Sequence, residues 1–343
     1  MDKDTKIVFF GAGAIGASVG AWLVPHHSNT WFVDQGAVKE AMKSEGITVY
    51  QGDAKESTMI SHPVNVVEDL SELKDADIIF LGVKNYSLES VAKMINEITG
   101  DGPLIISMAN GAENQKILPR YFSRVVYAVI SYNAWMDKPV VVGYQKKGPV
   151  ILGTPDNSLI HEMNGLADLL GKGVETVVTQ HLEDAVHCKI VVNLTNSLTT
   201  LIGHGFKEVS DVDTFQKLLT NTLYEGVQVI SKEGYRECQL GGMPTWGKMK
   251  AGARLPMFLT RGMFRSNVSK MVMSSMSQDI IQRGGLESEL GTINGYIIEM
   301  ADKNNLDVPY NRAIYKLCQE KFGEAEFQPL DVKDVWTRVQ ELS

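Results

Sequence analysis

The polar side chains of one apolar segment are the first candidates for chemistry. The stretch HCKIVVNLTNS at 187–197 carries Lys189, Asn193 and Asn196 among Ile, Val and Leu residues. On a helix these three side chains fall on one stripe, and Thr200 continues it. A lysine in a poorly solvated cleft has a lowered pKa and can deliver a proton near neutral pH. Such an acid suits reduction of a ketone, in which it protonates the developing alkoxide while a hydride reaches carbon.

Two interpretations of Lys189 remain open from the residues alone. Its stem could pack on the helix while its ammonium reaches water, which is the common fate of lysines. The amides beside it favour the catalytic interpretation, in which the Asn193 side chain orients a substrate. The histidines are not spaced like a metal site or a catalytic triad, so we interpret them as structural: His181, His187 and His204.

A glycine-rich turn lies between the first expected strand and the first expected helix. KIVFF at 6–10 is a short apolar strand, GAGAIG follows at 11–16, and the helix-compatible ASVGAWL comes next. Gly11 permits the tight turn, Gly13 lets the backbone approach a pyrophosphate, and Gly16 lets the helix pack closely on the strand. The helix N-terminus offers its N–H groups to the phosphates. We therefore expect a dinucleotide site formed by Gly11, Ala12, Gly13, Ala14, Ile15 and Gly16.

The second expected strand, TWFVD at 30–34, ends in an acidic residue. Asp34 can accept hydrogen bonds from ribose hydroxyls, and its charge would repel a 2′-phosphate. Gln35 follows, where an NADP-binding protein often carries arginine. The pair favours NADH, but a capping or turn role for Asp34 fits the local sequence equally well.

Two more apolar strands end in polar residues. Lys84 stands at the end of DADIIFLGV at 75–83, and Asn110 lies at the end of PLIISMANG at 103–111. Ligands of parallel sheets bind beyond the carboxyl ends of the strands. Both side chains are therefore placed to reach a cofactor or an acid, although Lys84 could also be a solvated loop lysine.

Periodicity divides the chain into a Rossmann-type α/β domain at 1–180 and an all-helical domain at 181–343. The β-rich segments VVYAVISYNAWM, PVVVGYQ and GPVILGT predict an antiparallel extension of the first domain's sheet, before a helix at 157–171 and a strand at 173–180. In the second domain we expect helices at 181–203, as one long helix, and at 213–234, 271–284, 292–305 and 310–323.

Three regions of the second domain are ambiguous. The segment 238–264 is expected to be irregular, as a pocket-lining insertion, a mobile cap or an ordinary surface excursion. SSMSQDI at 274–280 offers Ser274, Ser275 and Asp279, and ESELGTING at 287–295 offers Glu289 before a helix beginning near Thr292. Either group could be only a helix cap or a loop charge.

Composition excludes several classes of protein. The 343 residues carry a net charge of −8, which argues against nucleic-acid or anionic-membrane partners. The three cysteines, Cys188, Cys238 and Cys318, are far apart, so neither a disulfide framework nor a metal site is expected. The start lacks the features of a secretory signal, and no apolar run is long enough to span a membrane. We expect a cytoplasmic protein.

Six motifs in a fixed order carry a family resemblance: GAGAIG, VKNYSL, MANGAEN, KIVVNLTNSLTTL, SSMSQDI and SELGTINGY. Together they resemble the ketopantoate reductase (2-dehydropantoate 2-reductase) family over nearly the whole chain. The resemblance implies an NAD(P)H-dependent oxidoreductase of pantothenate biosynthesis that reduces a 2-oxo acid, with NADPH as the usual cofactor.

The resemblance also implies roles for individual residues. It makes Lys189 the general acid and assigns substrate binding to Asn193. Glu289 serves catalysis by positioning cofactor and substrate. The remaining implied contacts are with the cofactor for Lys84 and Asn110, and with the substrate for Asn110, Ser275 and Asp279.

The chain departs from the family's pattern in several places. Asp34 and Gln35 stand where the family commonly has an arginine for the 2′-phosphate of NADPH. The pattern N-P-L-T-A-L becomes NSLTTL from Asn196, one residue closer to Asn193, and HGFKEV replaces a substrate-binding asparagine near residue 206.

Ketopantoate is the default substrate. The alternatives are another 2-oxo or hydroxy acid, an opine-type dehydrogenase, or a dinucleotide sensor without turnover. The helical domain could supply a homodimer interface.

Overall fold

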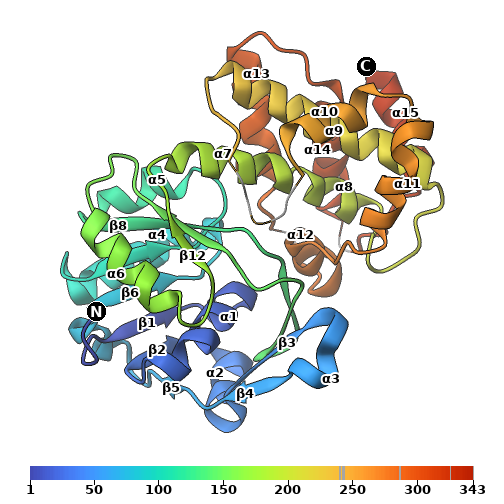
Figure 1. Ribbon diagram of the computed structural model, residues 1–343. Helices are drawn as coiled ribbons and strands as arrows, with labels where there is room; N and C mark the ends of the chain where they lie inside the picture. Colours follow the sequence, from blue (N-terminus) through green and yellow to red (C-terminus); the bar gives the residue numbers. More distant parts are fainter. Residues whose placement is uncertain (239–240, 242–243, 286, 325, 343) are drawn as a thin grey trace. The chain divides into compact units, whose positions relative to one another are not determined.

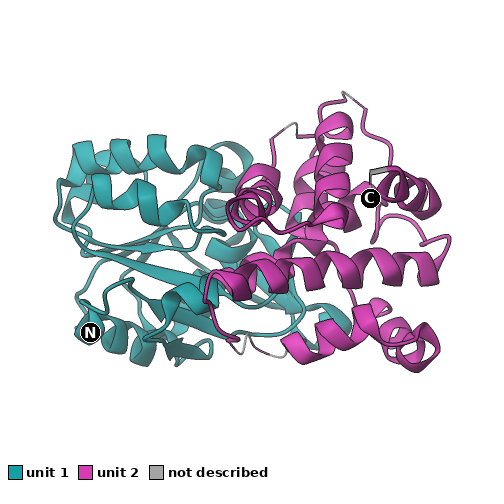
Figure 2. Cartoon of the chain, turned by 90° about the horizontal axis from the view of Figure 1, so that it is seen from above, with its two compact units in different colours: residues 1–186 teal, residues 187–343 magenta. Residues whose placement is uncertain are grey.

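The computed structural model describes residues 1–343 apart from 239–240, 242–243, 286, 325 and 343. The chain divides into two compact units, Met1–Val186 and His187–Ser343 (Figure 2). The first is mixed α/β and the second is helical, which confirms the predicted fold class. The expected domain boundary after residue 180 stays a prediction. Within the described ranges, no helix is long and apolar enough to cross a membrane.

The first unit is built on an eight-stranded sheet in the order β12-β11-β8-β7-β6-β1-β2-β5 (Figure 1). Six strands are parallel: β1 (Ile7–Phe10), β2 (Thr30–Val33), β5 (Asn65–Val66), β6 (Ile78–Leu81), β7 (Leu104–Ser107) and β8 (Val125–Ile130). The edge strand β12 (Thr176–Val178) runs parallel to β11 (Val150–Gly153), which is antiparallel to β8. The inner strands are buried apolar runs, as expected for a sheet covered on both faces.

Helices connect the parallel strands, which need crossovers. The longer ones are α1 (Ala14–Leu23), α2 (Gly36–Glu45), α4 (Asn85–Thr99) and α6 (Ile160–Leu170), and the short ones are α3 (Lys55–Thr58) and α5 (Asn114–Ile117). Between the strands, the ring of Phe9 stacks on Phe80 and Phe32, with ring centroids 4.5 and 5.4 Å apart. Helix α1 is buried from Gly16 to Leu23, so it needs apolar cover on more than one side.

A second, four-stranded sheet supplies that cover, which the sequence did not predict. Its order is β4-β3-β10-β9, with β3 (Ile47–Gln51), β4 (Ile60–His62), β9 (Ala134–Lys138) and β10 (Val141–Tyr144). The predicted antiparallel extension is therefore right for β11 but wrong for β8, which is parallel to β7. It is also wrong for β9 and β10, which form a hairpin outside the main sheet. Helix α1 contacts β3, β9 and β10, and Trp22 of α1 packs edge-on against Tyr144 at 5.0 Å. Burial of this second face of α1 decides where the hairpin lies.

The second unit surrounds the long helix α9 (Val212–Lys232). It includes the C-terminal part of α7 (Leu182–Asn193), together with α8 (Thr195–Leu201), α10 (Trp246–Arg254), α11 (Met257–Val268), α12 (Ser275–Ser277), α13 (Tyr296–Lys303), α14 (Pro309–Lys321) and α15 (Val332–Leu342). Two π-helical segments complete it, η5 (Gln278–Gln282) and η6 (Gly291–Gly295). Gly226 of α9 allows α7 to approach, because a Cβ there would lie 2.5 Å from the Leu194 side chain.

The prediction of one helix over 181–203 is wrong at Leu194, where α7 ends and α8 begins. Side-chain hydroxyls bond the carbonyls of this turn. The Thr195 hydroxyl donates to the Val192 carbonyl, and the Ser197 hydroxyl donates to the Leu194 carbonyl, both at 2.9 Å. Such local hydrogen bonds compete with the regular helical pattern and bend helices.

The other helix predictions need smaller corrections. The helix expected at 271–284 begins only at Ser275, because the Ser274 hydroxyl caps it by accepting the Ser277 N–H at 3.1 Å. The irregular segment expected at 238–264 is wrong from Trp246 on, where α10 and α11 form. Gly252 of α10 permits close packing on α9, since a Cβ there would lie 3.0 Å from Thr220. Residues 239–240 and 242–243 of that segment lie outside the described residues.

Candidate active site

The glycine turn after β1 has the geometry that the sequence predicts. Gly11 has φ +94°, a conformation that side chains disfavour. A Cβ on Gly16 would lie 2.1 Å from the Gly11 carbonyl oxygen, so only glycine lets α1 pack this closely on the turn. A Cβ on Gly13 would meet no described heavy atom within 4 Å. The backbone at Gly13 is therefore open to an approaching group.

Asp34 fixes the end of β2 against this turn. One carboxylate oxygen accepts the Ala12 N–H at 2.7 Å, and the other accepts the Gln35 N–H at 2.8 Å. The first helical turn of α1 has no side-chain cap among the described residues, so its N–H groups can serve an anion. An open glycine, an available helix N-terminus and a fixed carboxylate fit the phosphates and a ribose of a dinucleotide.

The loops that follow β6 and β7 are joined by hydrogen bonds. Lys84 is the N-terminal cap residue of α4, and the neighbouring Asn85 donates to the Asn110 carbonyl at 2.6 Å. Asn114 donates to the Ser107 hydroxyl at 3.0 Å and to the Ala109 carbonyl at 3.2 Å, which supports the Asn110 loop from behind. The structure thus brings the two predicted loops together. Asn85 and Asn114 lie inside the motifs VKNYSL and MANGAEN, and neither was expected from the sequence to have a role.

Lys189 is buried on α7 in the second unit, with a relative exposure of 8%. Burial lowers the pKa of Lys189 to about 8, and the negative charge of Glu289 acts in the opposite direction. The side chains of Glu289 and Asn193 are also buried. A lysine with this pKa is mostly protonated at pH 7 and becomes neutral readily after it gives up a proton.

Hydroxyl groups tie the start of α12 to α8. The Ser277 hydroxyl bonds to the Thr200 hydroxyl at 2.9 Å and to the Ser274 hydroxyl at 2.8 Å. Thr200 is fully buried, so this contact anchors the segment that carries Ser275. Ser275 itself is half-buried at the first position of α12. The predicted stripe assumed one helix, but the break at Leu194 places Lys189 and Asn193 on α7 and Asn196 and Thr200 on α8.

The two π-helical segments carry or follow predicted residues, and π-helical turns are frequent at functional sites. Asp279 in η5 forms an ion pair with Arg283 at 3.1 Å. Glu289 precedes η6, whose Asn294 donates to the Ser197 hydroxyl at 3.0 Å. Ser197 and Asn294 are fully buried, and neither residue was expected from the sequence to have a role.

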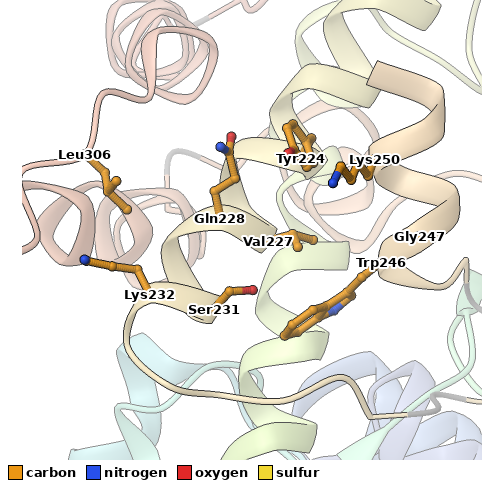
Figure 3. A pocket seen from close by; sticks show the side chains of 9 residues that line it. All are labelled: Tyr224, Val227, Gln228, Ser231, Lys232, Trp246, Gly247, Lys250 and Leu306. Carbon is orange, nitrogen blue, oxygen red and sulfur yellow. The ribbon is translucent and has the colours of Figure 1, made fainter. Parts of the chain in front are cut away.

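A pocket of about 550 Å³ lies elsewhere in the second unit, between α9, α10 and Leu306 (Figure 3). Its walls combine the rings of Tyr224 and Trp246 with the side chains of Lys232 and Lys250. Its lining, as described, includes no residue predicted to take part in chemistry. Size alone does not make this pocket the active site, because the buried lysine and its carboxylate lie outside it.

A Rossmann-type unit with this glycine turn, followed by a helical unit with a buried lysine, defines a nicotinamide-dependent oxidoreductase. Comparison with known protein families supports the assignment to the oxidoreductases. The pattern described as "Ketopantoate reductase PanE/ApbA" matches residues 7–157, and the pattern of its C-terminal part matches residues 181–322. The chain therefore belongs to the ketopantoate reductase family.

Individual relatives are distant but span almost the whole chain. A 2-dehydropantoate 2-reductase of Archaeoglobus fulgidus is 27% identical over 316 residues, covering 92% of this chain and 97% of the relative. D-mandelate dehydrogenase, solved with NADH and anilino(oxo)acetate, has a TM-score of 0.76 at 21% identity, covering 93% and 99% of the chains. A dimeric ketopantoate reductase from Staphylococcus aureus has a TM-score of 0.66 at 21% identity, covering 93% and 98%.

Proposed function

We propose that this protein reduces a 2-oxo acid to the 2-hydroxy acid, with 2-dehydropantoate as the first substrate to test. The observation that carries the proposal is the buried Lys189, whose lowered pKa and carboxylate neighbour Glu289 suit a proton donor. The A. fulgidus relative, named a 2-dehydropantoate 2-reductase, supports the choice of substrate.

In the proposed reaction, a bound reduced nicotinamide dinucleotide supplies the hydride. Lys189 donates a proton from Nζ to the substrate's carbonyl oxygen. Burial favours the neutral amine that remains, and the charge of Glu289 favours its reprotonation. Glu289 thus keeps Lys189 charged between turnovers.

Binding roles are assigned to the remaining predicted residues. The Asn193 amide, one helical turn after Lys189, orients the substrate. The Ser275 hydroxyl receives the substrate's carboxylate end, and Asp279 supports that segment through its ion pair with Arg283. In the first unit, Gly11–Gly16 and Asp34 hold the dinucleotide, while Lys84 and Asn110 complete its contacts and Asn110 also serves the substrate.

We propose NADH as the preferred cofactor, although NADPH is usual in the family. The carboxylate of Asp34 is fixed beside the glycine turn, and its charge opposes a 2′-phosphate. D-mandelate dehydrogenase, which has a similar fold, was solved with NADH. Initial rates with equal concentrations of NADH and NADPH test this choice, and a strong preference for NADPH contradicts it.

One specific observation favours a different 2-oxo acid. D-mandelate dehydrogenase, solved with anilino(oxo)acetate, shares the fold over nearly the whole chain. A substrate with an aromatic group is therefore the second candidate. An opine-type reaction and a sensor without turnover remain alternatives, and a sensor has no need of a buried acid and its carboxylate.

The deciding experiment measures oxidation of the reduced cofactor with a panel of 2-oxo acids that includes 2-dehydropantoate and phenyl-substituted acids. Lys189→Ala is measured beside the unmodified protein. We expect turnover to fall about 10²–10⁴-fold, the usual contribution of a general acid, with dinucleotide affinity unchanged. Turnover close to that of the unmodified protein would remove Lys189 from the mechanism. Inactivity toward the whole panel would favour the opine-type or sensor alternatives.

We also propose a homodimer formed through α11. Phe258, Leu259 and Met263 expose 78%, 59% and 58% of their surface on one side of this helix. The opposite side packs on α9, where Phe264 meets Phe215 and Thr260 bonds to Gln216. An apolar stripe on a single helix can pair with its own copy about a two-fold axis. The S. aureus relative, described as dimeric, supports a second copy as the occupant.

Sedimentation velocity of Phe258→Glu/Met263→Glu tests the dimer. We expect dimers for the unmodified protein and monomers for the variant. Lys146→Glu, an exposed change in the first unit, is the control for added charge. A monomeric unmodified protein, or a variant that stays dimeric, contradicts this interface.

A further inference from the structure

We propose that Ser197 and Asn294 are positioning residues that hold the segment of Glu289 against the end of α7, the helix that carries Lys189 and Asn193. The proposal rests on the proposed function, in which Glu289 keeps Lys189 charged. It adds a pair of residues whose side chains act through Glu289 rather than on the substrate.

The contact between the two residues is a single, fully buried hydrogen bond. Asn294 Nδ2 donates to Ser197 Oγ at 3.0 Å, and Ser197 Oγ donates onward to the Leu194 carbonyl at 2.9 Å. Both side chains have a relative exposure of 0%. The chain of bonds therefore joins η6 to the turn between α7 and α8, which follows Asn193 directly.

Two hydrogen bonds to its carbonyl attach Glu289 to the segment that carries Asn294. The Ile293 N–H donates to the Glu289 carbonyl at 3.1 Å, and the Thr292 hydroxyl donates to the same carbonyl at 3.2 Å. Ile293 directly precedes Asn294, and both residues lie in η6. Because Ser197 holds Asn294, it also holds the backbone to which Glu289 is bonded.

A second hydrogen bond joins α7, on the N-terminal side of Lys189, to the start of α13. The His187 ring nitrogen Nε2 bonds to the Tyr296 hydroxyl at 2.9 Å, and the same ring stacks on Tyr235 at 3.6 Å. His187 precedes Lys189 on α7, and Tyr296 follows Asn294. The chain around Lys189 is thus bonded to the segment after Glu289 on both sides, by His187 before the lysine and by Ser197 after it.

Stability alone does not account for Asn294. Its Oδ1 is buried without a hydrogen-bond partner among the described residues. An unsatisfied buried amide oxygen costs about 1–3 kcal/mol, which offsets the roughly 0.5–1.5 kcal/mol that the single Nδ2 bond contributes. What the asparagine provides is the direction of its Nδ2 bond to Ser197. This supports a role in geometry.

The test compares Ser197→Ala and Asn294→Ala with Glu289→Gln and with Thr199→Val. Thr199 is a matched control, because it is a buried hydroxyl residue of the same helix that bonds only to the carbonyls of Thr195 and Asn196 among the contacts described. For each variant, kcat/KM is measured across pH 6–10, with thermal unfolding and dinucleotide affinity alongside. Glu289 is the charged group that acts on Lys189 in this structure.

If Glu289 loses its position, Lys189 loses the charge that favours its protonated form. We expect the alkaline limb of the profile to move to lower pH by roughly half a unit or more in Ser197→Ala, Asn294→Ala and Glu289→Gln. We expect kcat to fall about tenfold and dinucleotide affinity to stay unchanged. For Thr199→Val, the alkaline limb of the kcat/KM profile should stay at the pH of the unmodified protein.

The outcomes separate the two proposals. A limb that moves in Glu289→Gln but stays in place in both Ser197→Ala and Asn294→Ala overturns the positioning role and leaves the proposed function intact. Loss of thermal stability without a moved limb also overturns it, since a structural role predicts that result. Full turnover by Lys189→Ala would instead overturn the proposed function, and the positioning role with it.

Discussion

The carboxylate of Asp34 accepts the backbone N–H of Ala12 at 2.7 Å, so the end of β2 is tied directly to the glycine turn after β1. This bond gives Asp34 two tasks. It stabilises the conformation of the turn, and in the proposed dinucleotide site it places a negative charge beside the ribose. We therefore expect a change at Asp34 to disturb the turn as well as the proposed choice of cofactor.

Gln35→Arg should improve binding of NADPH without this disturbance. The backbone N–H of Gln35 bonds to Asp34 and is kept in the variant, while the new guanidinium can pair with a 2′-phosphate. We expect about tenfold tighter NADPH binding and little change for NADH, measured by fluorescence titration. Asp34→Ala should weaken both cofactors, and an effect restricted to one of them would contradict the structural task of Asp34.

Gly13→Ala and Gly16→Ala should separate binding from folding. No described heavy atom lies within 4 Å of a Cβ placed on Gly13, so alanine fits there. Its methyl group would, however, obstruct the approach of the dinucleotide. At Gly16 a Cβ would lie 2.1 Å from the Gly11 carbonyl oxygen, which the backbone must move to relieve. We expect normal thermal unfolding and about tenfold or greater loss of dinucleotide affinity for Gly13→Ala. For Gly16→Ala we expect a destabilised protein, and equal stability of the two variants would contradict this division.

The pH dependence of turnover should report Lys189. The acid must be protonated to act, and burial lowers its pKa to about 8. We expect kcat/KM for ketone reduction to fall as pH rises above about 8, with no matching loss in the reverse, oxidative direction, where the neutral amine is required. An alkaline limb above pH 10 would show that Lys189 is solvated.

Burial of Lys189 should lower the stability of the folded protein. The pKa is about 8 when folded against 10.5 as the ordinary value, so the folded state binds fewer protons between these limits. The penalty is fully present below pH 8 and disappears as pH rises to 10.5. At about 1.4 kcal/mol per pKa unit, Lys189→Met should stabilise the protein by up to about 3 kcal/mol at pH 7. Denaturant unfolding should show a smaller gain at pH 10, and destabilisation at both pH values would refute this account.

Glu225 should make stability fall as pH rises. Its carboxylate accepts the N–H groups of Tyr310 and Asn311 at the start of α14, at 3.0 and 2.9 Å. Burial raises the pKa of Glu225 to about 7 from an ordinary value of 4.5, so the folded state binds the extra proton within this window. Stability is therefore greatest below pH 4.5 and declines up to about pH 7. Relative to Glu225→Gln, the unmodified protein should lose up to about 3 kcal/mol across this range. Parallel unfolding curves from pH 4.5 to 7 would contradict the raised pKa.

The sequence by itself determined the elements with strong local signals. The turn GAGAIG needs glycine for reasons that lie within a few residues, and the apolar runs at β1, β6 and β7 are long enough to identify as buried strands. The family followed from six ordered motifs. Lys189 stood out because a lone ammonium in an apolar helix is conspicuous.

Only the tertiary structure decided the features that depend on partners far along the chain. The β9–β10 hairpin forms its own sheet because α1 requires cover, and periodicity carries no information about that cover. The predicted long helix breaks at Leu194, where hydroxyl groups of neighbouring residues bond to the backbone carbonyls. The bond between Ser197 and Asn294 joins residues 97 positions apart. Ser and Asn are common in loops and caps, so neither carries a signal until the fold buries both side chains together.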